Sequence, residues 1–169
     1  MTEFSTSSSI ISPTVLAPEE QKAVWFLGAL VTQRVSSAST AGAFAVLEHR
    51  GERGYGSPLH RHHQDDETFL VLDGELRVEV DGEKRGAGAG AIAVLPRALP
   101  HAFVVTSPTA RFLTLHTPGG FDAFTLRAGS AATPPHLTVP ADLPPLDPAE
   151  LARMAASFGI EILGPPPAV

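Results

Sequence analysis

Three histidines and three carboxylates fall within twelve residues, in the stretch PLHRHHQDDETF (58–69). Imidazole nitrogens and carboxylate oxygens are common donors in protein sites for divalent transition metals. Side chains two positions apart in a strand share a face, so we expect His60 and His62 to point one way and His63 to point away, toward solvent. We expect the QDD turn to form a hairpin, which places Glu67 on the neighbouring antiparallel strand opposite the two histidines.

A fourth ligand must come from another strand. His101 is the best candidate, because it follows the Pro-bounded turn PRALPH (96–101) and begins the apolar strand HAFVV. Three imidazoles and one carboxylate without a thiolate suit one divalent first-row metal, namely Fe, Ni, Co, Mn, Cu or Zn. Such a set leaves coordination positions open, which indicates chemistry on a bound substrate or water. The predicted metal ligands are therefore His60, His62, Glu67 and His101.

Other polar residues near these positions have simpler explanations. We expect Asp65 and Asp66 to serve the turn, with a hydrogen bond from one of them to a metal ligand as the alternative. His116 lies in an apolar strand, where we expect a packed or pocket-lining side chain rather than a fifth ligand. His49 and His136 are expected to be structural or exposed.

The composition excludes several classes of function. The 169 residues are 43% hydrophobic and 18% charged, which is typical of one globular domain. A net charge of −6 without a run of Lys or Arg argues against nucleic acid as a partner. Without cysteine there is no disulfide, thiolate site or cysteine nucleophile. We find neither a signal peptide nor a membrane span, so no membrane partner and a cytoplasmic location are expected.

Short strands joined by Gly- and Pro-rich turns are expected over most of the chain, which indicates an all-β sandwich, jelly roll or small barrel. The segment ELRVEV alternates apolar and polar residues, and the Asp-Gly pair after it predicts a hairpin. The main expected strands cover residues 24–35, 40–50, 75–80 and, as a last strand of the barrel, FDAFTLR (121–127).

The character of the sequence changes after Gly129, where prolines become frequent. The segment DPAELARMAASFG (147–159) carries a helix signature, with Asp147 as N-cap, Pro148 at the first helical position and Gly159 at the end. We therefore expect three parts, and the helix is expected to pack on the barrel. These parts are a flexible lead-in over 1–20, a β-barrel over 21–128 and a Pro-rich arm with the helix over 129–169.

Two segments resemble the paired motifs of the cupin superfamily. The first, GYGSPLHRHHQDDETFLVLDG, matches at Gly54, His60, His62, Glu67 and Gly74. The second, GAIAVLPRALPHAFVV, matches at Gly90, Pro96 and His101, with Ala98 where Gly is usual and Val105 where Asn is usual. The alternative is a chance spacing of strand histidines, and the joint match over two motifs argues against it.

Most of the chain after residue 20 is similar to single-domain cupins of the quercetin 2,3-dioxygenase-like kind. The resemblance implies a double-stranded β-helix (jelly roll) with one C-terminal helix, and a small aromatic or polyphenolic substrate that reacts with O2. It also implies that Glu67 is catalytic: the base takes the enol proton of the substrate, and the enolate then reacts with O2 and the ring is cleaved. We further expect a homodimer, because cupins commonly pair through strand edges and the strand VWFLGALV is apolar enough to be covered by a partner.

Two alternatives to a dioxygenase remain, because one fold can support many activities. One is a metal-dependent cupin that uses no oxygen, such as an isomerase or cyclase acting on a polyketide-like intermediate. The other is a non-enzymatic cupin that binds a small molecule. A lead-in of about 20 residues is too short for a helix-turn-helix domain, which argues against a DNA-binding sensor.

Overall fold

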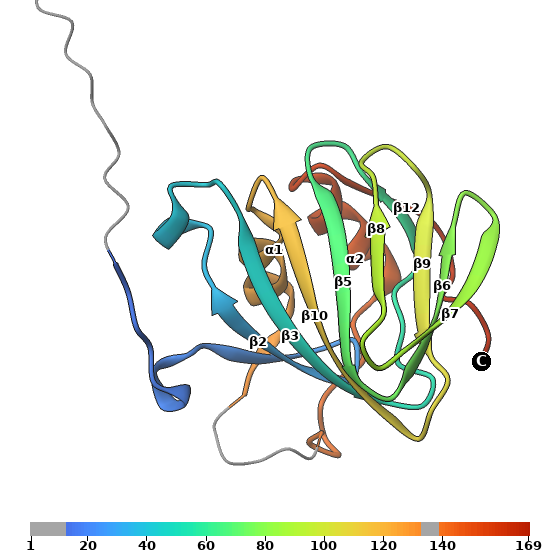
Figure 1. Ribbon diagram of the computed structural model, residues 1–169, viewed down its shortest axis with the longest axis horizontal. Helices are drawn as coiled ribbons and strands as arrows, with labels where there is room; N and C mark the ends of the chain where they lie inside the picture. The colour runs from blue at the N-terminus through green and yellow to red at the C-terminus, as the bar shows by residue number, and fades with distance from the viewer. Residues whose placement is uncertain (1–12, 133–138) are drawn as a thin grey trace, which may run out of the picture.

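The computed structural model describes residues 13–132 and 139–169, and it folds into two antiparallel β-sheets with two α-helices (Figure 1). Residues 1–12 of the expected lead-in, part of the Pro-rich arm and His136 lie outside these ranges. The elements are η1 (Pro18–Glu20), β1 (Ala23–Phe26), β2 (Ala29–Val35), η2 (Ala38–Thr40), β3 (Ala45–Glu52), β4 (Leu59–His62), β5 (Asp66–Asp73), β6 (Glu75–Val80), β7 (Glu83–Gly88), β8 (Ile92–Leu95), β9 (His101–Val105), β10 (Thr109–Thr117), α1 (Phe121–Ala128), β11 (Ser130–Ala131), α2 (Pro148–Ala156) and β12 (Ile160–Gly164).

The two sheets differ in size. The larger sheet has the strand order β11-β1-β2-β3-β10-β5-β8, and the smaller has the order β12-β4-β9-β6-β7. An aromatic core fills the space between them, with rings of Phe69, Phe103 and Phe112 that pack at centroid distances of 5.2–5.5 Å. The predicted jelly roll of the cupin type is therefore confirmed.

Local sequence patterns explain several strands directly. In β6, Leu76 and Val78 are buried in the core, as the alternation of ELRVEV predicts. Asp81 and Gly82 join β6 to β7 with φ angles of 49° and 83°. Two successive positive φ angles are those of a type I′ hairpin turn, so the predicted hairpin is confirmed.

Residues 24–35 form two strands, so the prediction of one strand is wrong here. The chain turns back at Leu27 and Gly28, whose φ angles are 52° and 84°, and Val24 then pairs with Val31 across β1 and β2. Glycine adopts a positive φ without strain, which makes this two-residue turn possible within an apolar run.

The segment FDAFTLR forms the helix α1, so the prediction of a last barrel strand is wrong. Phe124, Thr125 and Ala128 are buried at the i, i+1 and i+4 spacing of one helix face. Asp122 is also buried, and its Oδ2 accepts hydrogen bonds from the backbone amide of Ser37 and the side-chain amide of Gln33. A short apolar run is ambiguous between helix and strand, and packing decides it here.

The C-terminal helix α2 is confirmed. The Asp147 carboxylate accepts a hydrogen bond from the Ala149 amide at 2.9 Å, which is the geometry of an N-cap. Leu151 and Ala155 are buried in a second apolar cluster, which joins α1, α2, β12 and the strands β1 to β3. No helix within residues 13–132 and 139–169 is long and apolar enough to cross a membrane.

The strand expected to lie under a second subunit is covered by its own chain. Val24, Trp25 and Phe26 of β1 are each at most 5% exposed, and β1 runs between β11 and β2 within the large sheet. That expectation for the segment VWFLGALV is therefore wrong, and the homodimer itself stays a prediction.

Candidate metal centre

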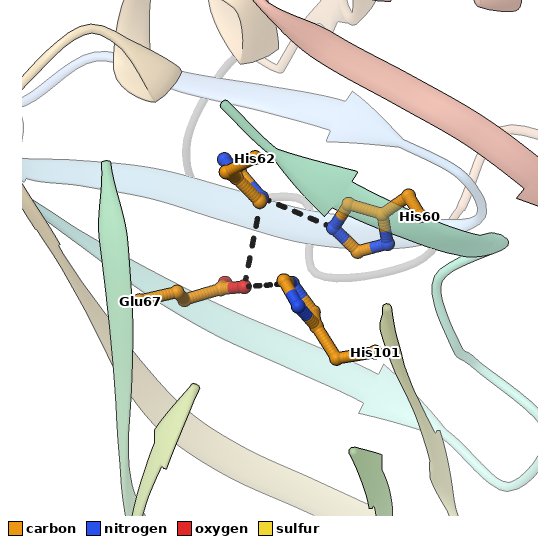
Figure 2. A group of neighbouring side chains, drawn as sticks. All are labelled: His60, His62, Glu67 and His101. Carbon is orange, nitrogen blue, oxygen red and sulfur yellow. Dashed lines mark hydrogen bonds and ion pairs between the residues drawn. The ribbon is translucent and has the colours of Figure 1, made fainter. Parts of the chain in front are cut away.

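The four predicted ligands converge between the two sheets (Figure 2). His60 and His62 lie on β4 and His101 lies on β9, all in the small sheet, while Glu67 lies on β5 of the large sheet. One donor atom of each side chain lies within 4.8 Å of a donor atom of each of the others. All four side chains are buried, with at most 6% exposed.

The path by which Glu67 reaches the histidines differs from the expected hairpin. Strands β4 and β5 belong to different sheets, so the QDD segment is a corner between sheets, and Glu67 faces the histidines across the sandwich. His60 instead pairs in register with His101 on the adjacent strand β9. The alternation along β4 still places His60 and His62 on one face, as the strand period requires.

The donor atoms crowd together at one point. Nε2 of His60 and Nε2 of His62 are 3.1 Å apart, and Oε2 of Glu67 lies 3.2 Å from Nε2 of His101 and 3.8 Å from Nε2 of His62. Two imidazole nitrogens therefore lie beside one carboxylate oxygen, and the nitrogen of His60 lies against that of His62. Nε2 of His101 is buried and has no hydrogen-bond partner, so this atom is available to bind another group.

The hydrogen-bond partners of the three Nδ1 atoms, which point away from the centre, show where the imidazole protons lie. Nδ1 of His60 faces the Pro58 carbonyl at 2.8 Å, and Nδ1 of His101 faces the Leu99 carbonyl at 2.9 Å. Nδ1 of His62 faces the carboxylate of Asp65 at 3.0 Å. Carbonyl and carboxylate oxygens only accept hydrogen bonds, so each Nδ1 carries the proton and each Nε2 presents a lone pair to the centre.

This arrangement fits a divalent cation. Burial, followed by the neighbouring His101 and His62, lowers the pKa of His60 to about 3, which keeps this imidazole neutral and able to bind metal. Burial alone would raise the pKa of Glu67, and only positive charge on its neighbours, His116 first, lowers the pKa overall; where the imidazoles are neutral, a metal cation has to supply that charge. Three lone pairs and one anion repel one another without a cation between them, and a metal ion would relieve that repulsion.

The two departures from the second cupin motif have local explanations. Ala98 adopts a φ of 68°, the left-handed conformation that the usual glycine would take without strain. Its amide donates to the His62 carbonyl at 2.7 Å, which fixes the turn against β4. Val105 is fully buried in the aromatic core, and its backbone amide donates to the Tyr55 carbonyl, so an apolar side chain fits this position.

The surroundings of the cluster on the helical side are apolar. A small cavity of about 30 Å³ reaches His60 and is lined mainly by Phe26, Leu27, Pro58, Phe121, Phe124, Leu151, Ile160 and Ile162. The Phe121 ring also packs against His62, at a centroid distance of 5.4 Å, and stacks on His116 at 4.2 Å. Helix α1 therefore closes the cluster from solvent on this side.

His63 is exposed, as expected, and contacts Glu161 at 3.1 Å. Asp66 is half-buried as the first residue of β5 rather than part of the turn, and it forms an ion pair with Arg97.

Asp65, His116 and His49 are buried and hydrogen-bonded in a chain that ends at His62, which agrees with a packed His116 and a structural His49. The pattern of the sequence placed Asp65 in a turn and offered a hydrogen bond to a ligand only as the alternative, and that alternative is the observed geometry.

Comparisons with known proteins agree with this architecture. Residues 47–116, which contain both motifs, match the model of the cupin domain family. The chain is 30% identical over 102 residues to a quercetin 2,3-dioxygenase of Bacillus subtilis (strain 168); this match covers 60% of the chain and 30% of that relative, so the chain spans less than a third of its length.

Solved structures share the fold. KdgF from Halomonas sp. superposes with a TM-score of 0.59 at 21% identity, over 66% of this chain and 99% of the other. An RmlC-like cupin from Shewanella frigidimarina gives a TM-score of 0.57 at 18% identity, over 66% and 96%. With two facing sheets, both sequence motifs and a buried His/Glu cluster at the motif positions, residues 47–116 form a cupin domain.

Proposed function

We propose that the protein is a metal-dependent dioxygenase that cleaves a flavonol-like or other aromatic enol substrate with O2. The observation that carries the proposal is the convergence of three imidazole lone pairs and one carboxylate in a buried site, at the positions of both motifs. The 30% identity to a quercetin 2,3-dioxygenase supports the reaction class.

Four side chains would hold the metal, namely His60, His62, Glu67 and His101. A divalent ion in this set would act as a Lewis acid that favours the ionised form of a substrate enol. In the proposed reaction Glu67 would receive the enol proton, because it is the one member of the set that can accept a proton while the imidazoles keep their places. Its Oε2 faces the imidazole nitrogens, and its Oε1 lies 3.4 Å from Nε2 of His116.

The apolar lining beside His60 suits an aromatic substrate. A cavity of about 30 Å³ has room for a molecule of the size of water or O2, and a flavonol is much larger. Binding of a flavonol therefore requires movement of side chains such as Phe121 and Leu27. Phe121 lies at the start of α1 and Leu27 in the turn between β1 and β2, so these two segments would have to move.

Oxygen uptake by metal-loaded protein tests the proposal. The protein is loaded separately with Mn, Fe, Co, Ni, Cu or Zn and mixed with quercetin and with simpler phenolic enols. We expect at least one metal to give oxygen consumption that matches substrate loss one to one, and the His62→Ala variant to give none. Substrate loss without oxygen uptake would instead indicate the isomerase or cyclase alternative. Tight substrate binding without turnover for every metal would indicate a binding protein.

The proposed assembly is a homodimer, and the proposed location is the cytoplasm. Light scattering at micromolar concentration tests the first of these, and a monomer there would contradict it.

A further inference from the structure

Asp65 bridges two histidines with its two carboxylate oxygens. Its Oδ1 lies 3.0 Å from Nδ1 of His62, and its Oδ2 lies 2.8 Å from Nδ1 of His116. An ionised carboxylate only accepts hydrogen bonds, so both imidazoles donate from Nδ1.

The hydrogen bonds continue away from His62 in one direction. When His116 is neutral and donates from Nδ1, its Nε2 accepts from the Thr114 hydroxyl at 3.2 Å, and the same Nε2 lies 3.4 Å from Oε1 of Glu67. The same hydroxyl oxygen accepts from Nε2 of His49 at 3.1 Å. Nδ1 of His49 then accepts from the Tyr55 hydroxyl at 2.8 Å. With both His49 and His116 neutral, the buried chain from Tyr55 to Asp65 has one consistent set of proton positions.

We propose that Asp65, braced by His116, is a positioning residue that fixes the tautomer and ring orientation of the metal ligand His62, given the metal site proposed above. His60 and His101 need no such residue, because backbone carbonyls hold their Nδ1 protons. His62 depends on a side chain for the same purpose. Partners of this kind raise the basicity of a ligand and hold it ready for the metal.

A second cation site is the competing explanation for these residues, because His62, Asp65 and His116 also lie close enough together to hold an ion. An ion there would need lone pairs on both Nδ1 atoms. The proton of His62 would then sit on Nε2, and His62 would leave the four-residue cluster. The Nδ1–oxygen distances of 2.8 and 3.0 Å are those of hydrogen bonds. We therefore assign Asp65 the role of accepting the Nδ1 proton of His62 rather than that of a ligand in a second cation site.

The substitution Asp65→Asn tests the assignment, with Asp66→Asn as the matched control. The Asn amide has one accepting oxygen and one donating nitrogen. Its oxygen can accept the Nδ1 proton of one imidazole, but its nitrogen can hydrogen-bond to the other only if that ring carries its proton on Nε2. The same change one residue away alters an exposed ion pair with Arg97. We expect the affinity for Zn²⁺, measured by competition with a chromophoric chelator, to fall about 10- to 100-fold in Asp65→Asn. The control variant should stay within about threefold of the wild type.

Two further measurements separate positioning from a merely structural role. Long-range ¹H–¹⁵N spectra of the metal-free protein should show the proton of His62 on Nδ1 in the wild type, and a mixture of tautomers in Asp65→Asn. Thermal unfolding of the metal-free variants reports stability independently of affinity. Unchanged Zn²⁺ affinity and an unchanged His62 tautomer in folded Asp65→Asn would overturn the assignment. A wild type that binds no Zn²⁺ would instead reject the metal site itself.

The variant His116→Phe keeps the proposal testable if Asp65→Asn does not fold. The new ring preserves the stacking on Phe121 but removes the donor to Asp65, so this carboxylate loses its brace. We expect a loss of Zn²⁺ affinity smaller than that of Asp65→Asn, with the Nδ1 proton of His62 retained. Affinity equal to that of the wild type would show that His116 does not brace Asp65.

Discussion

Two buried glutamates lie on β3 and β5, the two strands that flank β10 in the large sheet, and their carboxylates contact different kinds of side chain. Glu48 of β3 is 3% exposed and is met by three guanidinium groups, from Arg34 at 2.6 Å, Arg50 at 2.8 Å and Arg111 at 2.9 Å. Glu67 of β5 is 4% exposed and is met by imidazoles. Both carboxylates are removed from water, but only one of them has permanent counter-charges within its own chain.

The difference shows that burial of a carboxylate does not by itself indicate a functional site. Arginine is always protonated and only donates, so the cluster around Glu48 is complete as it stands. The imidazoles around Glu67 are neutral ligands whose lone pairs point inward, so that cluster is incomplete without a cation. The chemistry of the partners therefore indicates a structural role for Glu48 and supports the proposed metal-binding role of Glu67.

The largest effect is expected from removal of an imidazole in the incomplete cluster. The substitution His62→Ala deletes one donor and also leaves Asp65 without one of its two partners. We expect elemental analysis to find almost no bound metal and assays to find no turnover. His63→Ala, a change on the exposed face of the same strand end, should keep full metal. Metal content near one per chain in His62→Ala would contradict the ligand set.

The next largest effect concerns the carboxylate itself. Glu67→Gln keeps the shape and one oxygen donor but removes the base. If Glu67 accepts the substrate proton, turnover should fall by about 10²–10⁴ while much of the metal is retained. Metal content and turnover are measured on the same preparation. Full activity with full metal would show that Glu67 is only a ligand or a bystander, and the dioxygenase mechanism would have to be abandoned.

The convergence of the four proposed ligands could be predicted from the sequence because most of the signal is local. His60 and His62 share a face through the two-residue strand period, and Glu67 follows after a short turn. Only His101 had to come from a distant strand, and its place after a Pro-bounded turn indicated it.

The rest of the site depends on the register between strands that are far apart in the sequence. His116 and Asp65 are 51 residues apart and meet because β10 pairs with β5 in a register that sets His116 opposite Glu67. Similarly, Arg34 and Arg111 reach Glu48 from the two strands that flank β3. Nothing in the local pattern around any of these residues specifies that pairing.

A smaller effect, on stability alone, is expected from the complete cluster. Glu48→Gln removes the counter-charge of three guanidinium groups and turns an amide nitrogen toward them. We expect a loss of about 1–3 kcal/mol in the free energy of unfolding of the metal-free protein, the range for a buried hydrogen-bonded charge. Zn²⁺ affinity should not change, in contrast to changes in the other cluster. Glu161→Gln, which alters an exposed pair with Arg61, is the control and should lose less.

The smallest effect is the pH dependence of that same stabilisation. Burial opposes ionisation of Glu48, but hydrogen bonds from Arg111, Arg50 and Arg34 outweigh it and lower its pKa from 4.5 to about 2. As the pH falls, the unfolded chain takes up this proton before the folded one does, which favours unfolding. The contribution of Glu48 is therefore complete above about pH 4.5 and decreases toward pH 2.

The difference in unfolding free energy between wild type and Glu48→Gln isolates this contribution, because Asp65, Asp66 and Glu67 titrate in both proteins and cancel. Denaturant titrations at several pH values between 6 and 2 measure it. We expect the difference to be constant from pH 6 to about 5 and to shrink steadily below that. A difference that stayed constant down to pH 2 would mean that the charge of Glu48 does not contribute to it. Shape and hydrogen bonds alone would then distinguish Glu from Gln beside the three arginines. The contrast between the two buried glutamates would then rest on packing rather than on charge.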